Sequence, residues 1–377
     1  MNKISTTFES KDTVDFIIDD NADLEWLSSI SDSSYDRCFV IIDENVDDIW
    51  GERIFGKLKN NGAEVFELRV KPVEESKSLS YYPVALEFLE KNRCGRFDLV
   101  IAIGGGIIID LASFTVSTYM RGLPLYIVAT TLIGQVDAST AGKTCLNTTT
   151  SKNLLGTFYY PLIVYNNIEF LTTNKKNILR QGFSEIFKYG LLDSKPLVDM
   201  LIEYEKNSDI LLLEKIILQT IESRISIRKK DALASNLGHT FGHALEKYSS
   251  YKILHGDAIS MGTVMALNYA VRRGEMTTNT KDEIVNMMKY LGLNIYLDSS
   301  VEAGPLVEKM MSDKKSSSKA LNLVLLKEIE KPYSDAHGLF YKTDPNEVVD
   351  FLQGFISTYE YRIDNCDEYL LNDNLEY

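Results

Sequence analysis

The sequence predicts an α/β domain followed by an all-α domain, and two observations lead to this prediction. In the first half of the 377 residues, short apolar runs alternate with segments of helical spacing, which is typical of βαβ units and a mainly parallel sheet. From about residue 180 onward, most segments show the 3.6-residue apolar period, and strand patterns nearly vanish. We therefore expect an α/β domain over residues 1–178, a mostly helical domain over residues 179–360 and an acidic tail over residues 361–377.

Five apolar runs in the first half are predicted to be buried strands. They cover residues 37–45, 62–70, 97–106, 124–131 and 161–167. The segments at residues 50–62 and 107–122 lie between them and have apolar residues at helical spacing. Because a parallel sheet binds its ligands beyond the carboxyl ends of its strands, functional residues are expected where these runs end.

The second half is expected to be helical, with one exception at residues 320–329, which could form a strand or a short hairpin arm. No Gly/Ser-rich linker occurs near residue 178, so we expect the two domains to pack closely with the active site in a cleft between them. The last 19 residues hold six acidic residues against Arg362 alone, which is typical of a solvated tail.

Composition excludes several classes of protein. A formal net charge of −14 argues against a nucleic-acid-binding surface, because phosphate contacts need clustered Lys and Arg. No stretch approaches the ~18 apolar residues of a membrane span, and the first residues lack the apolar core of a signal peptide. The four cysteines are scattered without a CxxC pair, which fits free thiols in a reducing cytoplasm. We therefore expect a cytoplasmic protein.

The predicted strand at residues 97–106 stops at Gly104, Gly105 and Gly106, directly before a predicted helix. Such a turn lets backbone N–H groups approach phosphate oxygens, and the helix N-terminus adds a favourable dipole. A tight strand–helix turn without a ligand is the alternative. Asp43 ends another predicted strand and could hold a ribose hydroxyl, or it could simply form a turn.

The segment at residues 130–156 combines lysines and amides with many small hydroxyl residues. Lys143, Lys152 and Asn153 are the candidates for binding a phosphate there, because fixed ammonium and amide groups suit an anion. The alternative is that these lysines are solvated surface residues.

Glu185 and Lys188 are spaced i,i+3 on a predicted helix. They could form a surface ion pair, which contributes a few tenths of a kcal/mol. Both residues, however, sit among Phe183, Ile186 and Phe187. A carboxylate in such apolar surroundings is either mostly exposed or held by a strong partner such as a cation.

Three of the four histidines crowd into residues 239–255. His239 and His243 are i,i+4 on one predicted helix face, and His255 lies where a new helix is expected to open. Two or three imidazoles and one carboxylate make an open Zn²⁺ site, although the glutamate of HExxH is missing, which argues against a metalloprotease. Histidines that pack or cap helices are the alternative.

Nine short motifs follow one another over roughly residues 40–330: DENV, EESKSL, GGGIIIDLASFTVSTYMRG, TTLIGQVDASTAGKT, SKNLLGTFYYP, GFSEIFKYG, NLGHTFGHALE, HGDA and DKK. In number and order they resemble the motifs of the 3-dehydroquinate synthase family of sugar phosphate cyclases. The resemblance implies a Rossmann-like NAD-binding α/β domain, a helical domain, a divalent metal (Zn²⁺ or Co²⁺) and a homodimer.

The same resemblance implies a role for individual residues. The metal ligands would be Glu185, His239 and His255, while Lys188, Asn236 and His243 would be catalytic residues that face the substrate. The NAD contacts would be Asp43, Asn45, Glu74, Lys77, Gly104, Gly105, Gly106, Asp110, Thr130, Thr131, Asp137 and Thr173. The substrate, a small phosphorylated sugar, would be bound by Lys143, Lys152, Asn153, Arg224 and Lys314 (or Lys315), with Arg121 reaching the active site of the partner subunit.

The activity that the resemblance implies is the cyclisation of 3-deoxy-D-arabino-heptulosonate 7-phosphate to 3-dehydroquinate. NAD would take a hydride and later return it, phosphate would leave by β-elimination, and an intramolecular aldol step would close the ring. The product would enter the shikimate pathway of aromatic amino acid biosynthesis.

One departure from the family's pattern concerns the substrate carboxylate. Ala232 stands where an arginine is expected, the segment before Asn236 is about six residues short, and Arg224 falls where a lysine is expected. The missing arginine favours an alternative function, that of a related cyclase of secondary metabolism of the 2-deoxy-scyllo-inosose or epi-valiolone type. Asn236 argues against this alternative. A metal-dependent alcohol dehydrogenase and a non-catalytic NAD-binding relative are further alternatives.

Overall fold

The computed structural model describes residues 13–30, 35–59, 62–149, 151–231, 234–311, 320–336 and 338–364. The chain divides into two compact units. Unit 1 comprises residues 1–130 and 138–170, and unit 2 comprises residues 131–137 and 171–377. Most of the expected acidic tail, from residue 365 onward, lies outside the described residues.

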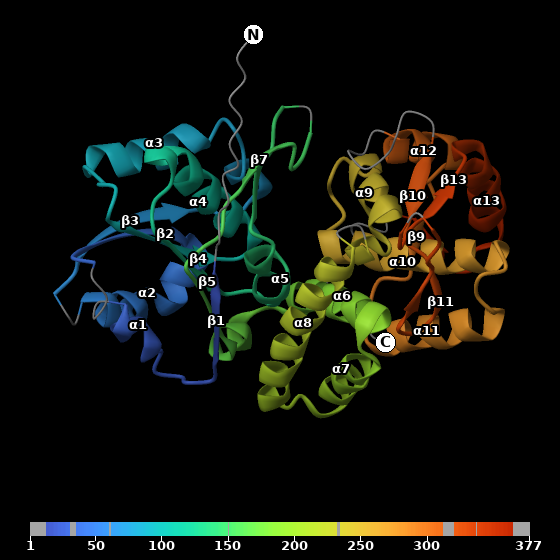
Figure 1. The fold of residues 1–377 in the computed structure, drawn as a ribbon, viewed down its shortest axis with the longest axis horizontal. Helices are drawn as coiled ribbons and strands as arrows, with labels where there is room; N and C mark the ends of the chain where they lie inside the picture. Colours follow the sequence, from blue (N-terminus) through green and yellow to red (C-terminus); the bar gives the residue numbers. More distant parts are fainter. Residues whose placement is uncertain are drawn as a thin grey trace, which may run out of the picture. The chain divides into compact units, whose positions relative to one another are not determined.

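Unit 1 is built on a six-stranded parallel sheet (Figure 1). All five predicted strands are confirmed, as β2 (Arg37–Asp43), β3 (Glu64–Val70), β4 (Leu99–Gly104), β5 (Leu125–Ala129) and β8 (Ile163–Asn167). The sixth strand, β1 (Asp15–Asp19), was not predicted and pairs with β8 at one edge, giving the order β1-β8-β5-β4-β2-β3. Every ladder in this sheet is parallel, as the βαβ pattern predicts.

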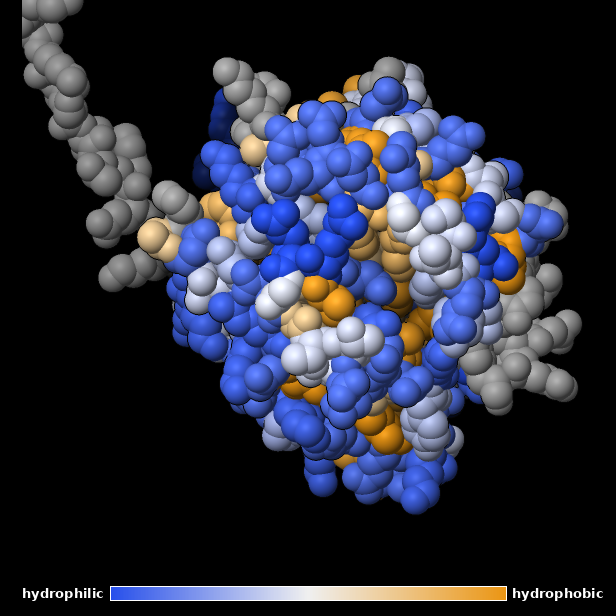
Figure 2. Space-filling view, turned by 90° about the vertical axis from the view of Figure 1, so that its right-hand side faces the viewer, coloured by the Kyte–Doolittle hydropathy of each residue, from blue (hydrophilic) through white to orange (hydrophobic). Residues whose placement is uncertain are grey.

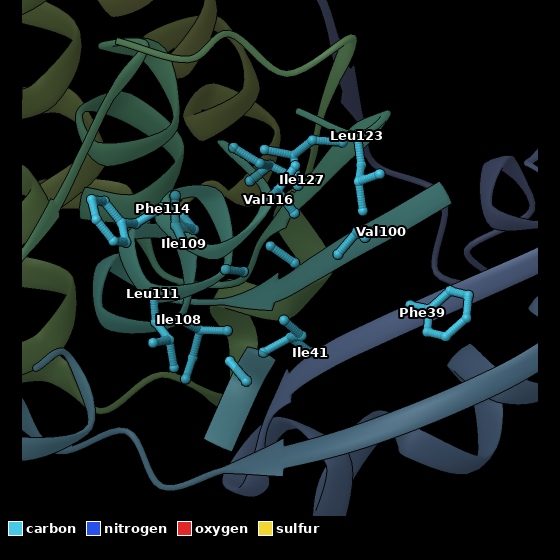
Figure 3. Close-up of a cluster of buried hydrophobic side chains, with 14 of the residues drawn as sticks. Phe39, Ile41, Val100, Ile108, Ile109, Leu111, Phe114, Val116, Leu123 and Ile127 are labelled. Carbon is cyan, nitrogen blue, oxygen red and sulfur yellow. The ribbon is translucent and has the colours of Figure 1, made fainter. Parts of the chain in front are cut away.

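Helices cover both faces of this sheet, so its central strands are buried on both sides. One face packs against α3 (Tyr82–Lys91) and α4 (Gly106–Thr118), and the other packs against α1 (Trp26–Ser29) and α2 (Glu44–Lys59). Figure 3 shows the first of these clusters, with side chains of α4 next to those of β2, β4 and β5. Alternate residues of β2 explain the arrangement, because Phe39 and Ile41 face one cluster while Val40 and Ile42 face the other.

The segment predicted as an anion-binding loop contains an antiparallel hairpin, which the sequence pattern did not reveal. Its strands are β6 (Lys143–Leu146) and β7 (Leu155–Phe158). Short 3-10 turns complete unit 1 as η1 (Glu74–Ser76), η2 (Tyr119–Arg121) and η3 (Ala138–Thr140).

Unit 2 is mostly helical, as predicted. Its helices are α5 (Leu132–Val136), α6 (Lys176–Asp193), α7 (Lys195–Asn207), α8 (Ile210–Lys230), α9 (His239–Tyr248), α10 (His255–Arg272), α11 (Thr278–Tyr290), α12 (Ala303–Met311) and α13 (Pro345–Thr358). Short turns η4 (Ile168–Thr173) and η5 (Ala234–Asn236) precede α6 and α9.

The predicted strand or hairpin arm at residues 320–329 takes part in two small antiparallel sheets of unit 2. Strand β10 (Leu321–Leu323) pairs with β13 (Tyr341–Thr343), and β11 (Leu326–Glu328) pairs with β12 (Lys331–Pro332). A two-residue strand, β9 (Leu297–Asp298), pairs in parallel with β14 (Arg362–Ile363).

Helices α9 and α10 cross at glycines. A Cβ atom added to Gly262 would lie 2.2 Å from the carbonyl oxygen of Gly238 and 2.6 Å from the backbone nitrogen of Gly242. Gly238 has a φ of +75°, a conformation that costs little only for glycine. This close approach places the first residues of the two helices, His239 and His255, in the same region of unit 2.

The face of the molecule shown in Figure 2 is largely hydrophilic, with hydrophobic residues visible in separate areas. Within the described part of the chain, no helix is both long and apolar enough to cross a membrane.

Candidate active site

Three side chains of unit 2 converge on one point although they come from three helices. Glu185 lies in the middle of α6, and His239 and His255 begin α9 and α10. The Nε2 atoms of both histidines lie 3.6 Å from Oε1 of Glu185. One ligand atom from each residue lies within 4.8 Å of the other two, which fits the spacing of ligands around a metal ion.

The buried Glu185 carboxylate has an unused acceptor that faces the two imidazoles. Its side chain is 0% exposed, and Oε2 accepts a 2.5 Å hydrogen bond from Nζ of Lys188. Among the described residues, no donor is hydrogen-bonded to Oε1. A buried acceptor without a donor is costly, so a cation at this point would satisfy an atom that the protein leaves unsatisfied. Two neutral nitrogens and one carboxylate oxygen suit Zn²⁺ or Co²⁺.

Electrostatics keep this carboxylate ionised. Burial alone would raise the pKa of Glu185, but the ammonium of Lys188 and the imidazoles of His239 and His255 hold that pKa well below its usual value. The pKa of Lys188, which burial alone would lower, is raised by Glu185. The pair therefore presents a charged carboxylate, which a metal ligand must be.

The other ring nitrogen of each histidine also has an acceptor. Nδ1 of His239 lies 3.1 Å from the carbonyl oxygen of Leu237, and Nδ1 of His255 lies 3.4 Å from Oε1 of Glu246. An acceptor at Nδ1 favours retention of the proton there, so a metal ion bound beside Glu185 would take the place of the Nε2 proton. Burial would lower the pKa of metal-free His255, but Glu246 and Glu185 raise it to about 10.

Two other predicted catalytic residues of unit 2 are His243, which lies beside this cluster, and Asn236, which lies near it in the sequence. The ring of His243 lies 5.2 Å from that of His239 and 6.0 Å from that of His255, centroid to centroid. Asn236 ends η5, three residues before His239 begins α9. Ala232, Lys314 and Lys315 lie outside the described residues.

Arg224, predicted to bind substrate, interacts with Asp137, predicted to bind NAD. Nη2 of Arg224 lies 3.1 Å from Oδ1 of Asp137, and Nη1 donates a hydrogen bond to the carbonyl oxygen of the same residue. The guanidinium also lies 5.9 Å from the ring of Tyr189. In this structure Arg224 therefore fixes the C-terminal end of α5 against α8, whatever it binds in addition.

We expect Arg224→Met to lower the free energy of unfolding by about 2 kcal/mol, because it removes charged hydrogen bonds from a largely buried position. Urea unfolding at pH 7 measures this change. Arg272→Met is the matched control: Arg272 is exposed at the end of α10, so a loss of at most ~1 kcal/mol is expected. Equal losses of unfolding free energy in the two variants would show that the interaction of Arg224 with Asp137 does not stabilise the protein.

In unit 1, the predicted glycine turn lies at the carboxyl edge of the sheet. Gly104 ends β4, Gly105 caps α4 and Gly106 begins it. A Cβ on Gly104 would lie 2.7 Å from Cγ1 of Ile108 and 3.2 Å from Cβ of Asp43, so strand, helix and Asp43 leave no room for a side chain. Asp43 is buried at the end of β2 and accepts a 2.8 Å hydrogen bond from the backbone N–H of Asn45. The start of α4, where Gly106 is partly exposed, is suited to a phosphate group.

A second group of predicted residues in unit 1 forms one connected network around Asn147. Nδ2 of Asn147 donates to Oε1 of Glu74 at 2.6 Å, and its Oδ1 accepts from the backbone N–H of Asn153 at 3.0 Å. Lys152 lies 3.3 Å from the other oxygen of Glu74. The structure thus joins Glu74, predicted to contact NAD, to Lys152 and Asn153, predicted to bind phosphate.

The network continues to Lys77 and Asp110, both predicted to contact NAD. Nζ of Lys77 lies 2.8 Å from Oδ2 of Asp110, and the thiol of Cys145 donates to the same oxygen at 3.1 Å. Burial opposes the charge of Lys77, but Asp110, Cys145 and Glu74 together outweigh the burial and raise the pKa of this ammonium group. Cys38, Cys94 and Cys145 are all free thiols, as expected from their spacing.

The remaining predicted site residues lie at the ends of strands, helices and turns. Thr130 follows β5 in unit 1 and donates its backbone N–H to Gly104, while Thr131 caps α5 and Thr173 ends η4 in unit 2. Lys143 begins β6 and is exposed. Arg121 is exposed in a turn where Met120, Arg121 and Gly122 all have positive φ, which displays the guanidinium on the surface of unit 1.

Two residues of these networks were missed as site residues. Glu246 follows His239 by seven residues and His243 by three, so helical spacing alone places it on the same face of α9 and could have identified it. Asn147 lies in the segment predicted to bind an anion, but its contact with Glu74, 73 residues earlier, could not be predicted from that segment.

Comparison with known families gives two adjacent matches. Residues 67–181 match the family described as 3-dehydroquinate synthase N-terminal, and residues 182–316 match the family described as 3-dehydroquinate synthase C-terminal. A curated 3-dehydroquinate synthase of Clostridium botulinum is 33% identical over 308 residues, which cover 79% of this chain and 87% of that protein.

Two solved structures share the fold. ValA, the 2-epi-5-epi-valiolone synthase of Streptomyces hygroscopicus with NAD⁺ and Zn²⁺ bound, has a TM-score of 0.83 at 20% identity and covers 94% of this chain and 99% of its own. A 2-deoxy-scyllo-inosose synthase complexed with carbaglucose-6-phosphate, NAD⁺ and Co²⁺ has a TM-score of 0.76 at 23% identity, covering 90% and 95%.

Proposed function

The chain belongs to the 3-dehydroquinate synthase family, and from this premise we propose that it cyclises 3-deoxy-D-arabino-heptulosonate 7-phosphate to 3-dehydroquinate with release of phosphate. It would act as a phosphate-eliminating carbon–oxygen lyase of the shikimate pathway. The observation that supports an active enzyme is the convergence of Glu185, His239 and His255 around an unsatisfied buried oxygen. A protein that only bound NAD would have no need of such a cluster.

Two groups that the chain does not itself contain would supply the redox and Lewis-acid chemistry. A divalent metal polarises an alcohol oxygen and lowers its pKa, and NAD accepts a hydride and returns it within one turnover. Glu185, His239 and His255 would hold the metal, and the charged state of Glu185 and the Nε2 lone pairs of the histidines suit that task. The residues proposed to hold NAD are those of the glycine turn and of the Glu74 and Lys77 network.

The other residues would bind and orient the substrate. Lys188 has three N–H donors, of which one is used by Glu185, so it can also hold a substrate oxygen. Asn236 and His243 would add donors beside the metal. Lys143, Lys152 and Asn153 would bind the phosphate, and we propose that Arg121 serves the partner subunit's site in a homodimer. Holding a flexible chain in a cyclising geometry is a large part of the catalysis expected of such a site.

Phosphate release from a panel of substrates tests the proposed function. We expect the purified protein, supplied with NAD and Zn²⁺, to release phosphate from 3-deoxy-D-arabino-heptulosonate 7-phosphate and to stop when the metal is removed by a chelator. Sedoheptulose 7-phosphate and glucose 6-phosphate are the comparison substrates, since neither carries the carboxylate. Release from one of these alone would contradict the proposal and assign the chain to a different cyclisation.

A further inference from the structure

Glu246 lies behind the proposed metal centre, and no predicted role accounts for it. Its side chain is 13% exposed and projects from the face of α9 that also carries His239 and His243. Oε1 of Glu246 lies 3.4 Å from Nδ1 of His255, whose opposite nitrogen lies 3.6 Å from Oε1 of Glu185. The imidazole of His255 is therefore held between two carboxylates, one on each side.

The backbone of Glu246 also shapes the turn that delivers His255. Its carbonyl oxygen accepts hydrogen bonds from the backbone N–H of Tyr251 at 2.6 Å and from the hydroxyl of Ser249 at 3.1 Å. Ser250 and Tyr251 have φ values of +53° and +65°, which non-glycine residues adopt only when their surroundings hold them there. Since these bonds involve the main chain, a change of the Glu246 side chain leaves them in place.

We propose that Glu246 is a positioning residue for the metal centre, acting through His255. By accepting a hydrogen bond from the Nδ1–H group of His255, its carboxylate fixes the ring orientation and keeps the proton on Nδ1, so that Nε2 is the nitrogen left to bind the metal. The negative charge also makes the imidazole a stronger electron donor to the metal. This inference rests on the metal site of the proposed function and adds a residue to it.

One other role for Glu246 would use the same geometry. His243, Glu246 and His255 also offer ligand atoms within 4.8 Å of one another, as a separate second metal site would. However, the site around Glu185 already engages Nε2 of His255, and Nδ1 faces Glu246 as a hydrogen-bond donor would. A largely buried carboxylate beside the second ring nitrogen of a ligand histidine is the arrangement of a carboxylate–histidine–metal triad.

Metal affinity tests the proposal independently of catalysis. Zn²⁺ dissociation constants would be measured by competition with a chromogenic chelator for the wild type, Glu246→Gln and Glu246→Ala, together with absorption spectra of the Co²⁺ forms. We expect Glu246→Ala to raise the dissociation constant roughly 10- to 100-fold and to change the Co²⁺ spectrum. Glu246→Gln keeps an acceptor oxygen, so its effect should be smaller. Glu222→Ala, on an exposed position of α8, is the control and should match the wild type.

The outcomes separate this inference from the function it rests on. An unchanged dissociation constant and Co²⁺ spectrum in Glu246→Ala would overturn the positioning role, whichever substrate the enzyme turns over. A loss of one of two bound metal ions, with the other bound at wild-type affinity, would also overturn it and indicate a second metal site. Thermal unfolding of the metal-free variants shows whether Glu246→Ala folds. If it does not, the smaller loss of affinity expected for Glu246→Gln is the deciding measurement, and wild-type affinity in that variant would overturn the role.

Discussion

Replacing Glu185 by glutamine is expected to abolish tight metal binding and to lower phosphate release on the order of 10³-fold. The amide keeps the shape of the side chain but removes the charge that faces His239 and His255. A metal that polarises an alcohol contributes several kcal/mol to the stabilisation of the transition state, and each 1.4 kcal/mol is tenfold in rate. Metal content by atomic absorption after dialysis, measured with the rate, checks both expectations.

The control for this variant is Glu203→Gln, on an exposed position of α7, which should keep the wild-type metal content and rate. Glu185→Gln leaves the buried ammonium group of Lys188 beside a neutral amide. A far-ultraviolet circular dichroism spectrum of Glu185→Gln is therefore needed to show that this variant folds. If folded Glu185→Gln retains stoichiometric metal, Glu185 is not a ligand and the proposed centre is wrong.

Much of the fold could be predicted because the signals were local. A strand such as residues 37–43 is buried on both faces, so it appears in the sequence as an unbroken apolar run. Helix α10 begins at His255, where the sequence predicts the start of a new helix. In contrast, β1 was missed because it is a partly exposed edge strand whose five residues begin and end with aspartate. Its place in the sheet comes from pairing with β8, about 150 residues later.

For the candidate site, too, local features could be predicted from the sequence and long-range contacts could not. Residue types and motif order were sufficient to nominate Glu185, His239 and His255, and the structure brings them together. What could not be predicted are the partners of the nominated residues. That Lys152 pairs with Glu74, or that Arg224 pairs with Asp137, depends on which loops and helices pack together. Such pairings are set by tertiary packing, and the spacing of residues along one segment gives no information about them.

The proposed metal centre depends on the glycine crossing of α9 and α10, because His239 and His255 lie at the start of these two helices. The three atoms nearest to a methyl group on Gly262 would all be backbone atoms of Gly238 and Gly242, and backbone cannot rotate away as a side chain can. The helices would have to separate. A metal site tolerates errors of only ~0.2 Å in its ligand distances, so the two histidines would no longer fit one ion well.

We therefore expect Gly262→Ala to lower the free energy of unfolding by about 3 kcal/mol and to weaken Zn²⁺ binding in the same variant, since overpacking a close-packed contact typically costs ~1–3 kcal/mol. Gly354→Ala is the matched control: this glycine lies within α13 with no neighbouring atom within 4 Å of an added Cβ. There the same substitution should stabilise the protein by up to about 1 kcal/mol through helix propensity. Urea unfolding of the metal-free proteins and chelator competition measure the two effects. The changes in the free energy of unfolding are expected to have opposite signs in the two variants, because Gly262 lies at a close helix approach and Gly354 does not. A stable Gly262→Ala with wild-type Zn²⁺ affinity would show that the crossing does not set the geometry of the centre.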